Sequence, residues 1–209
     1  MKRIIITVFF AVLLWAQTPF TLINPTYLGN EKRNYYGNKA PDRLDIIWKI
    51  QLGEGITKIG QKEHIWKGSG WTGQPLMVEE NDTLFLIQGS FDHHLKKIYA
   101  ANGDIKWEYE FPDAIKGTGT LWAPPGSKDK KHQLIIIQGS RRGPKYSTWS
   151  SHLHPLRAVS YVTGEEIWRY NVRRGASYSV DVDGSALLIN DIVYLGLENG
   201  YFVVFDPSP

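Results

Sequence analysis

Two aspartates are the residues in this chain most suited to binding a cation. They lie in the sequence Asp181-Val182-Asp183-Gly184, which has part of the pattern of a calcium loop but lacks the remaining oxygen ligands and the terminal glutamate. On an extended strand alternate residues share one face, so the two carboxylates would point the same way. If that strand is the innermost of a sheet, Asp181 and Asp183 could hold a metal ion. A turn or a polar channel lining is the other interpretation.

Three basic residues, each followed by a glycine, could form an anion site. They are Lys67, Lys116 and Arg174. If the three turns enter the innermost strands of successive repeats, the cations would surround one mouth of a channel. Accessible backbone N–H groups at the glycines would then add to the positive field. The alternative is three basic residues in solvated turns.

Residues suited to catalysis are sparse. The histidine pairs His93-His94 and His152-x-His154 lack a carboxylate–histidine motif of known spacing, and adjacent loop histidines are usually exposed. No nucleophile elbow, phosphate loop or zinc signature occurs, and the absence of cysteine excludes disulfides and Cys-ligated metals or haem. The net charge of +3 is too small for a polyanion-binding field, so nucleic acid is not an expected partner. We predict no catalytic residue.

The elements that would carry these residues repeat along the chain. Trp48, Trp107 and Trp168 each follow an acidic residue by three positions, and they are 59 and 61 residues apart. Before each of the last two comes an apolar run closed by glycine, at Gly89 and Gly139, and a weaker copy of that run ends at Gly196. We expect the tryptophans to be structural: a large ring on an outer strand packs between sheets, and its indole N–H bonds to a carbonyl.

Several short strand patterns per repeat predict an all-β fold, a β-propeller of four-stranded antiparallel blades. About three blades fit into residues 44–209, so the propeller is expected to be incomplete, with an isolated outer strand at Leu44 to Gly53 and unpaired edges that favour association. Residues 19–43 are predicted to be an extended N-terminal segment. Two stretches between strands are unusually long, Gly53 to Gly70 and Arg141 to Pro155, and long loops on a rigid scaffold often carry binding function.

Residues 84–107 and the segment Thr163-Gly164-Glu165-Glu166-Ile167-Trp168 resemble the pyrroloquinoline-quinone (PQQ)-type β-propeller repeat. The resemblance covers roughly residues 28 to 209. It implies the propeller fold, but the repeat is found both in quinoprotein dehydrogenases and in propellers that bind no quinone. A dehydrogenase of this family would need a calcium site, a catalytic aspartate and PQQ, and many members carry adjacent cysteines.

The N-terminus has the pattern of an export signal: Lys2 and Arg3 precede an apolar run from Ile4 to Trp15. We therefore predict a signal peptide at 1–18, no transmembrane segment beyond it, and a periplasmic or secreted protein. The favoured function is a non-catalytic binding or scaffold module without a cofactor, whose ligand is an unidentified protein or small molecule. The alternative is the N-terminal part of a PQQ-dependent dehydrogenase that holds PQQ and a calcium ion.

Overall fold

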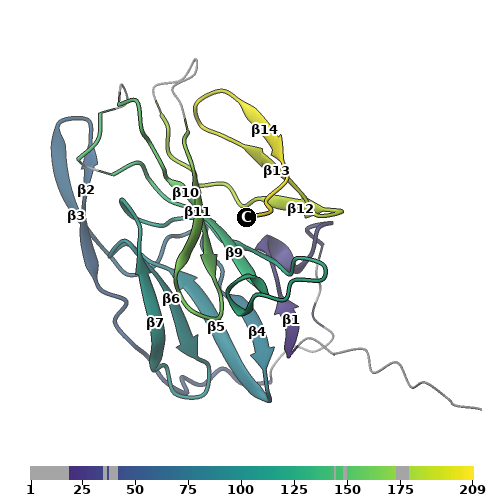
Figure 1. Cartoon of the computed structure of the whole chain (residues 1–209). Helices are drawn as coiled ribbons and strands as arrows, with labels where there is room; N and C mark the ends of the chain where they lie inside the picture. The colour runs from purple at the N-terminus through teal and green to yellow at the C-terminus, as the bar shows by residue number, and fades with distance from the viewer. Residues whose placement is uncertain (1–18, 35–36, 38–41, 144, 148–149, 173–178) are drawn as a thin grey trace, which may run out of the picture.

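The computed structural model describes residues 19–34, 37, 42–143, 145–147, 150–172 and 179–209, so the predicted signal peptide at 1–18 lies outside the described residues. The described chain is all-β, with two short 3₁₀ turns, η1 (Tyr27–Gly29) and η2 (Lys130–His132), and no α-helix. Its strands form three antiparallel sheets and a separate hairpin (Figure 1). The three sheets are successive blades of an incomplete propeller.

The first blade contains five strands. Its order is β1 (Phe20–Asn24), β4 (Leu76–Glu80), β5 (Thr83–Gly89), β6 (His94–Tyr99) and β7 (Ile105–Glu110). The sequence predicted four of these and placed β1 in an extended segment. Strand β1 pairs with the inner edge of β4 because its alternate residues Phe20 and Leu22 pack on the apolar core of the blade, and Phe20 contacts the ring of Tyr161 edge-on.

The second and third blades follow the same plan. The second has the order β8 (Thr120–Trp122), β9 (Ile135–Gly139), β10 (Leu156–Ser160) and β11 (Glu166–Tyr170). The third has three strands, β12 (Leu187–Ile189), β13 (Ile192–Gly196) and β14 (Phe202–Phe205). The glycine that ends β5, β9 or β13 pairs with an apolar residue of the next strand, β6, β10 or β14.

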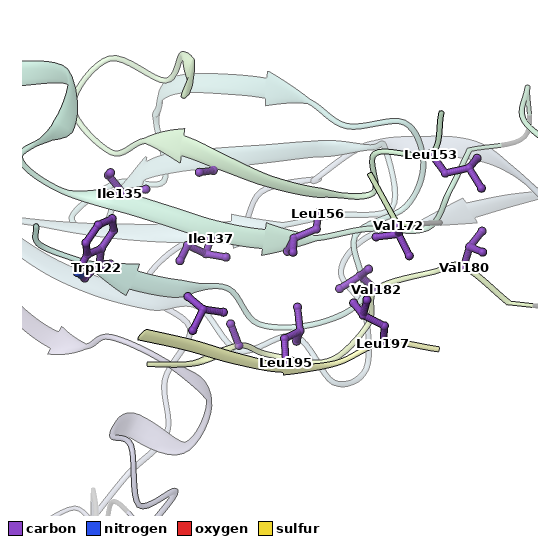
Figure 2. Close-up of a cluster of buried hydrophobic side chains, with 13 residues drawn as sticks. Trp122, Ile135, Ile137, Leu153, Leu156, Val172, Val180, Val182, Leu195 and Leu197 are labelled. Carbon is purple, nitrogen blue, oxygen red and sulfur yellow. The ribbon is translucent and has the colours of Figure 1, made fainter. Parts of the chain in front are cut away.

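The blades are joined by two apolar cores, one at each junction. Ile135, Ile137 and Leu156 of the second blade face Val193 and Leu195 of the third (Figure 2). The other core lies between the first and second blades and consists of the following buried side chains: Leu76, Val78, Phe85, Ile87, Leu95, Phe111, Ile115, Leu121, Leu134, Ile136, Val159 and Tyr161. Burying a single side chain of this size stabilises the fold by about 1.5–3 kcal/mol.

An additional hairpin, β2 (Glu54–Ile59) and β3 (Lys62–Lys67), stands beside the blades (Figure 1). It turns through the two residues Gly60 and Gln61, and Gly60 has a φ of +62°, which favours glycine. The long segment between Gly53 and Gly70 is therefore a folded hairpin. By contrast, residues 44–53 are not a strand, which corrects the prediction of an isolated outer strand there.

The N-terminal segment crosses the inner edges of all three blades. After β1 has paired with β4, the carbonyl of Pro25 accepts a hydrogen bond of 2.8 Å from the N–H of Leu121, which lies in β8. Further on, the guanidinium of Arg33 donates to the carbonyl of Ala186 at 3.1 Å, just before β12. These contacts fix the relative positions of the blades. Within the described ranges, no helix is long and apolar enough to span a membrane.

Candidate functional site

The three repeat tryptophans make the same contact. Trp48 donates its indole N–H to the carbonyl of Ala100 at 2.8 Å, Trp107 to Tyr161 at 3.0 Å and Trp168 to Pro207 at 2.8 Å. Each acceptor lies in or beside the turn that follows β6, β10 or β14. Turn glycines make room for two of the rings, since a Cβ at Gly103 or Gly164 would collide with Trp48 or Trp107. The three indoles therefore occupy structural positions between blades.

The three strand glycines differ in their surroundings. A Cβ at Gly89 would collide with the side chain of Ile115, and one at Gly139 would collide with the carbonyl of Val182. Both glycines thus allow the next blade to approach closely. Gly196 has nothing within 4 Å of such a Cβ, because no further blade faces it among the described residues.

Asp181 and Asp183 lie before β12, in a segment that is not a strand, and each already faces a cation. Asp181 is buried, and its Oδ2 accepts a hydrogen bond from Nε of Arg141 at 2.9 Å. Asp183 forms an ion pair with Lys116. Among the described residues, no three histidine, cysteine, aspartate or glutamate side chains gather to hold a metal ion. The innermost strand on which the metal interpretation depended is not present at these two positions, and cation binding by Asp181 and Asp183 stays a prediction.

Lys67 and Lys116 are not equivalent, contrary to the sequence prediction. Lys67 ends the hairpin strand β3 and pairs with Glu54 at 2.6 Å, whereas Lys116 lies in the segment that leads into β8. Backbone hydrogen bonds show the true counterpart of Lys116. Ile115 donates its N–H to Ser90, and Val182 donates its N–H to Ser140 in the same way, so the next residues, Lys116 and Asp183, are equivalent. Arg174 lies outside the described residues, and anion binding by the three cations stays a prediction.

The two long segments that interrupt the repeat meet at one cleft. Hairpin β2–β3 and the loop that begins at Arg141 both line an open pocket of about 570 Å³, which we call the insertion cleft. Its lining residues are Ile56, Glu63, His93, Glu110, Phe111, Pro112, Lys145, Tyr146 and Arg157. Two other hollows of similar size lie beside residues 50–54 with 67–69, and beside β14 with Tyr170. The insertion cleft alone of these three is lined by both insertions.

Arg141 holds the two insertions together. Its Nη2 donates to the carbonyl of Lys58 at 3.0 Å, its Nη1 donates to the hydroxyl of Thr57, and its guanidinium lies over the ring of Trp66, with the carbon 5.3 Å from the ring centroid. On its other side it pairs with Asp181. A planar guanidinium with five donors can make all these contacts at once. The hairpin is thus fixed to the second and third blades at the first residue of the other insertion.

The floor of the insertion cleft contains a histidine over a buried carboxylate. Nε2 of His93 lies 3.5 Å from Oδ1 of Asp113, and its side chain is 16% exposed. Asp113 in turn accepts a hydrogen bond from Thr57 of the hairpin at 3.0 Å and one from the N–H of Ala114 at 2.7 Å. The sequence suggested that His93 was a solvent-exposed loop residue; it is mostly buried.

The walls of the cleft carry exposed charges of both signs. Glu63 lies on hairpin β2–β3, Glu110 at the end of β7, and Lys145 on the second insertion. Ile56 of the hairpin adds exposed apolar surface to the cleft, whereas the ring of Phe111 is buried. Among the described residues that line the cleft, no hydroxyl is hydrogen-bonded to His93. The arrangement suits binding of a ligand with an apolar body and charged groups.

Comparison with known proteins gives only a distant likeness. No family model matches the chain, and no curated protein matches it. Among solved structures, a quinohemoprotein alcohol dehydrogenase from Pseudomonas putida is similar over 65% of this chain, with 16% identity and a TM-score of 0.44. This chain spans 19% of the length of that protein.

Proposed function

We propose that this chain belongs to an extracytoplasmic propeller of the PQQ-repeat type that acts as a non-catalytic binding module, with the insertion cleft as its ligand site. The observation that carries the proposal is the convergence of the two insertions. Residues common to the repeats, such as Trp107 and Gly139, serve contacts between blades. We therefore assign binding of a specific ligand to the two insertions, which depart from the repeat. Both insertions line the same cleft.

The chemistry of the cleft favours a peptide segment as the ligand. Glu63 and Glu110 can bind a cationic side chain, and Lys145 can bind a carboxylate. The exposed apolar surface of Ile56 can receive the aliphatic stem of such a side chain. Because the carboxylates are exposed, they are available for pairing without the cost of burying an unpaired charge.

A display experiment tests this proposal. A phage-displayed library of random peptides is selected on the chain and, separately, on a variant that carries both Glu63→Lys and Glu110→Lys. We expect the unmodified chain to enrich peptides with a basic residue, and the variant to lose them. A variant with both Glu31→Lys and Glu165→Lys, which makes the same change of charge at two exposed glutamates outside the cleft, is the matched control. Enrichment of the same peptides by the double variant would contradict the proposal.

The alternative function, a PQQ-dependent dehydrogenase, would require a different site in the same chain. PQQ enzymes of the resembling family need a calcium site, but Asp181 and Asp183 are each paired with a basic side chain and do not fit such a site. These two aspartates therefore support no step through the quinone. Titration with PQQ and calcium, followed by tryptophan fluorescence, distinguishes the two functions: saturable quenching would favour the dehydrogenase.

A further inference from the structure

Arg157, the second residue of β10, has hydrogen-bond donors left over at the insertion cleft. Its Nε donates to the carbonyl of His154 at 3.2 Å, and its Nη1 donates to the hydroxyl of Tyr109 at 2.7 Å and to Glu166 at 3.2 Å. The remaining nitrogen, Nη2, bonds to none of the described residues and is not among their fully buried polar atoms that lack a partner. The guanidinium is therefore fixed through one side and available to a ligand through the other.

Positive charge exceeds negative charge around this guanidinium. Arg169 lies directly opposite Arg157 on β11, and both arginines pair with the single carboxylate of Glu166. Like charges at opposite positions of a strand pair repel each other, so a second anion beside them would be favourable. Burial lowers the pKa of His154, and so do the neighbouring positive charges, that of Arg169 first among them. The wall of the cleft that Arg157 forms therefore attracts anions.

Acidic and basic groups lie close together in the cleft lining. The carbonyl of Glu110 is 3.5 Å from Nη1 of Arg157, so the residue that carries one cleft carboxylate touches the guanidinium. Glu63 and Lys145 supply a further group of each sign, and within the described residues neither of them forms an ion pair, nor does the Glu110 carboxylate. A ligand residue that carries both charges matches this arrangement. A lysine or arginine at the C-terminus of a peptide is such a residue, because it joins a basic side chain to the terminal carboxylate.

We propose that the insertion cleft binds the C-terminal residue of a peptide and that Arg157 binds its terminal carboxylate. This assignment rests on the proposed function and names the part of the peptide that the cleft recognises. Glu63 and Glu110 bind the basic side chain, while Nη2 of Arg157 and the ammonium of Lys145 bind the carboxylate. Because Nε and Nη1 already fix the guanidinium, little side-chain freedom is lost when the carboxylate binds.

The two carboxylates of the cleft favour this ligand over a more highly charged anion. Glu63 and Glu110 would repel a phosphate group, which carries about −1.5 to −2 charge at pH 7. A terminal carboxylate carries less charge, and the basic side chain beside it compensates that charge. The cleft volume of about 570 Å³ is typical of a site for a small ligand, so it suits the end of a peptide rather than a folded domain. An acidic side chain within a peptide would supply the same group, and the experiment distinguishes the two sources.

Fluorescence anisotropy with synthetic peptides tests the assignment on the 209-residue chain. The first probe has a dye at its N-terminus, then four alanines and a C-terminal arginine with a free carboxylate. The second probe is the same peptide with a C-terminal amide, and the third is an amide with a glutamate next to the arginine. We expect the free acid to bind about tenfold more tightly than either amide, as the loss of one charge-assisted contact implies.

Substitutions at the two opposite arginines attribute this preference to one side chain. In Arg157→Gln the ratio of the affinities for acid and amide should fall to about one, since the contact to the carboxylate is lost. Arg169→Gln is the matched control, because it removes the other cation of Glu166 from outside the cleft lining, and it should keep the ratio. If thermal melts show that Arg157→Gln does not fold, Lys145→Gln at an exposed position should lower the ratio about threefold.

The possible failures are distinguishable. Equal binding of the acid and the amide, or a ratio that Arg157→Gln leaves unchanged, would overturn the assignment while peptide binding in the cleft stands. Tight binding of the amide that contains glutamate would show that a side chain supplies the carboxylate, which also rejects the chain end. Binding of none of the three peptides would contradict the proposed function and this assignment with it.

Discussion

Lys116 and Asp183 occupy the same position in successive blades, and their side chains form an ion pair. Lys116 follows Ile115, whose N–H donates to the carbonyl of Ser90 in the first blade. Asp183 follows Val182, whose N–H donates to the carbonyl of Ser140 in the second blade. The pair therefore links the segments that enter the second and third blades. Opposite charges therefore occupy two equivalent positions and pair with each other.

Loss of this pair should destabilise the second junction. Lys116→Gln leaves the partly buried carboxylate of Asp183 without its cation, and we expect the free energy of unfolding to fall by about 1–3 kcal/mol. Urea denaturation measures this change. The double variant with Asp183→Asn should recover part of the loss, and a double variant less stable than Lys116→Gln would show that the two side chains are not coupled.

Two substitutions at Trp107 separate the contribution of ring packing to stability from that of the indole hydrogen bond. Trp107→Ala should cost about 3–5 kcal/mol because it removes a large ring from the junction of the first two blades. Trp107→Phe keeps much of the ring but loses the N–H donor to Tyr161. It should therefore be destabilised by clearly less than the alanine variant. Thermal unfolding of the two variants checks the order, and equal losses would contradict the packing role.

Glu166 makes the stability of the junction between the first and second blades depend on pH. Burial raises the pKa of this carboxyl, but hydrogen bonds from Tyr109 and Arg169 and the charge of Arg157 outweigh it, so the pKa lies below its ordinary value of 4.5. A depressed pKa stabilises the fold above the ordinary value, and this stabilisation is lost as the pH falls through the folded-state pKa.

The expected result is a difference in stability that depends on pH. Glu166→Gln should be less stable than the unmodified chain at neutral pH, and the two should converge as the pH falls below about 4.5. Urea midpoints measured across this range provide the test. The exposed residue Glu31 serves as the control site, because Glu31→Gln should not change the curve. A constant gap between Glu166→Gln and the unmodified chain would show that the carboxylate pairs do not stabilise the junction.

The repeat was visible in the sequence because its contacts need particular residue types. Only tryptophan offers both a large ring and an indole N–H, and only glycine fits where a Cβ would meet the next blade, as at Gly139. The equivalence of Lys116 and Asp183 could not be predicted from the sequence, because the two residues carry opposite charges. It became evident only through backbone hydrogen bonds.

The insertion cleft could not be predicted for a different reason. Its two insertions occur once each, so no repeat marks them, and they are separated by about 70 residues of blade sequence. The turn Gly60-Gln61 between alternating strands was a local signal for hairpin β2–β3. Nothing local indicated that Arg141 would bind this hairpin, because that contact depends on how the first two blades pack.

The most direct test of the insertion cleft is hydrogen–deuterium exchange of the chain with and without a peptide enriched in the display selection. Ligand binding should slow amide exchange in hairpin β2–β3 and in residues 141–147, and leave exchange at β14 unchanged. The variant with Glu63→Lys and Glu110→Lys should show no slowing at the same peptide concentration. Protection confined to β14 or to the inner edges of the blades, with none at the two insertions, would contradict the assignment of the ligand site.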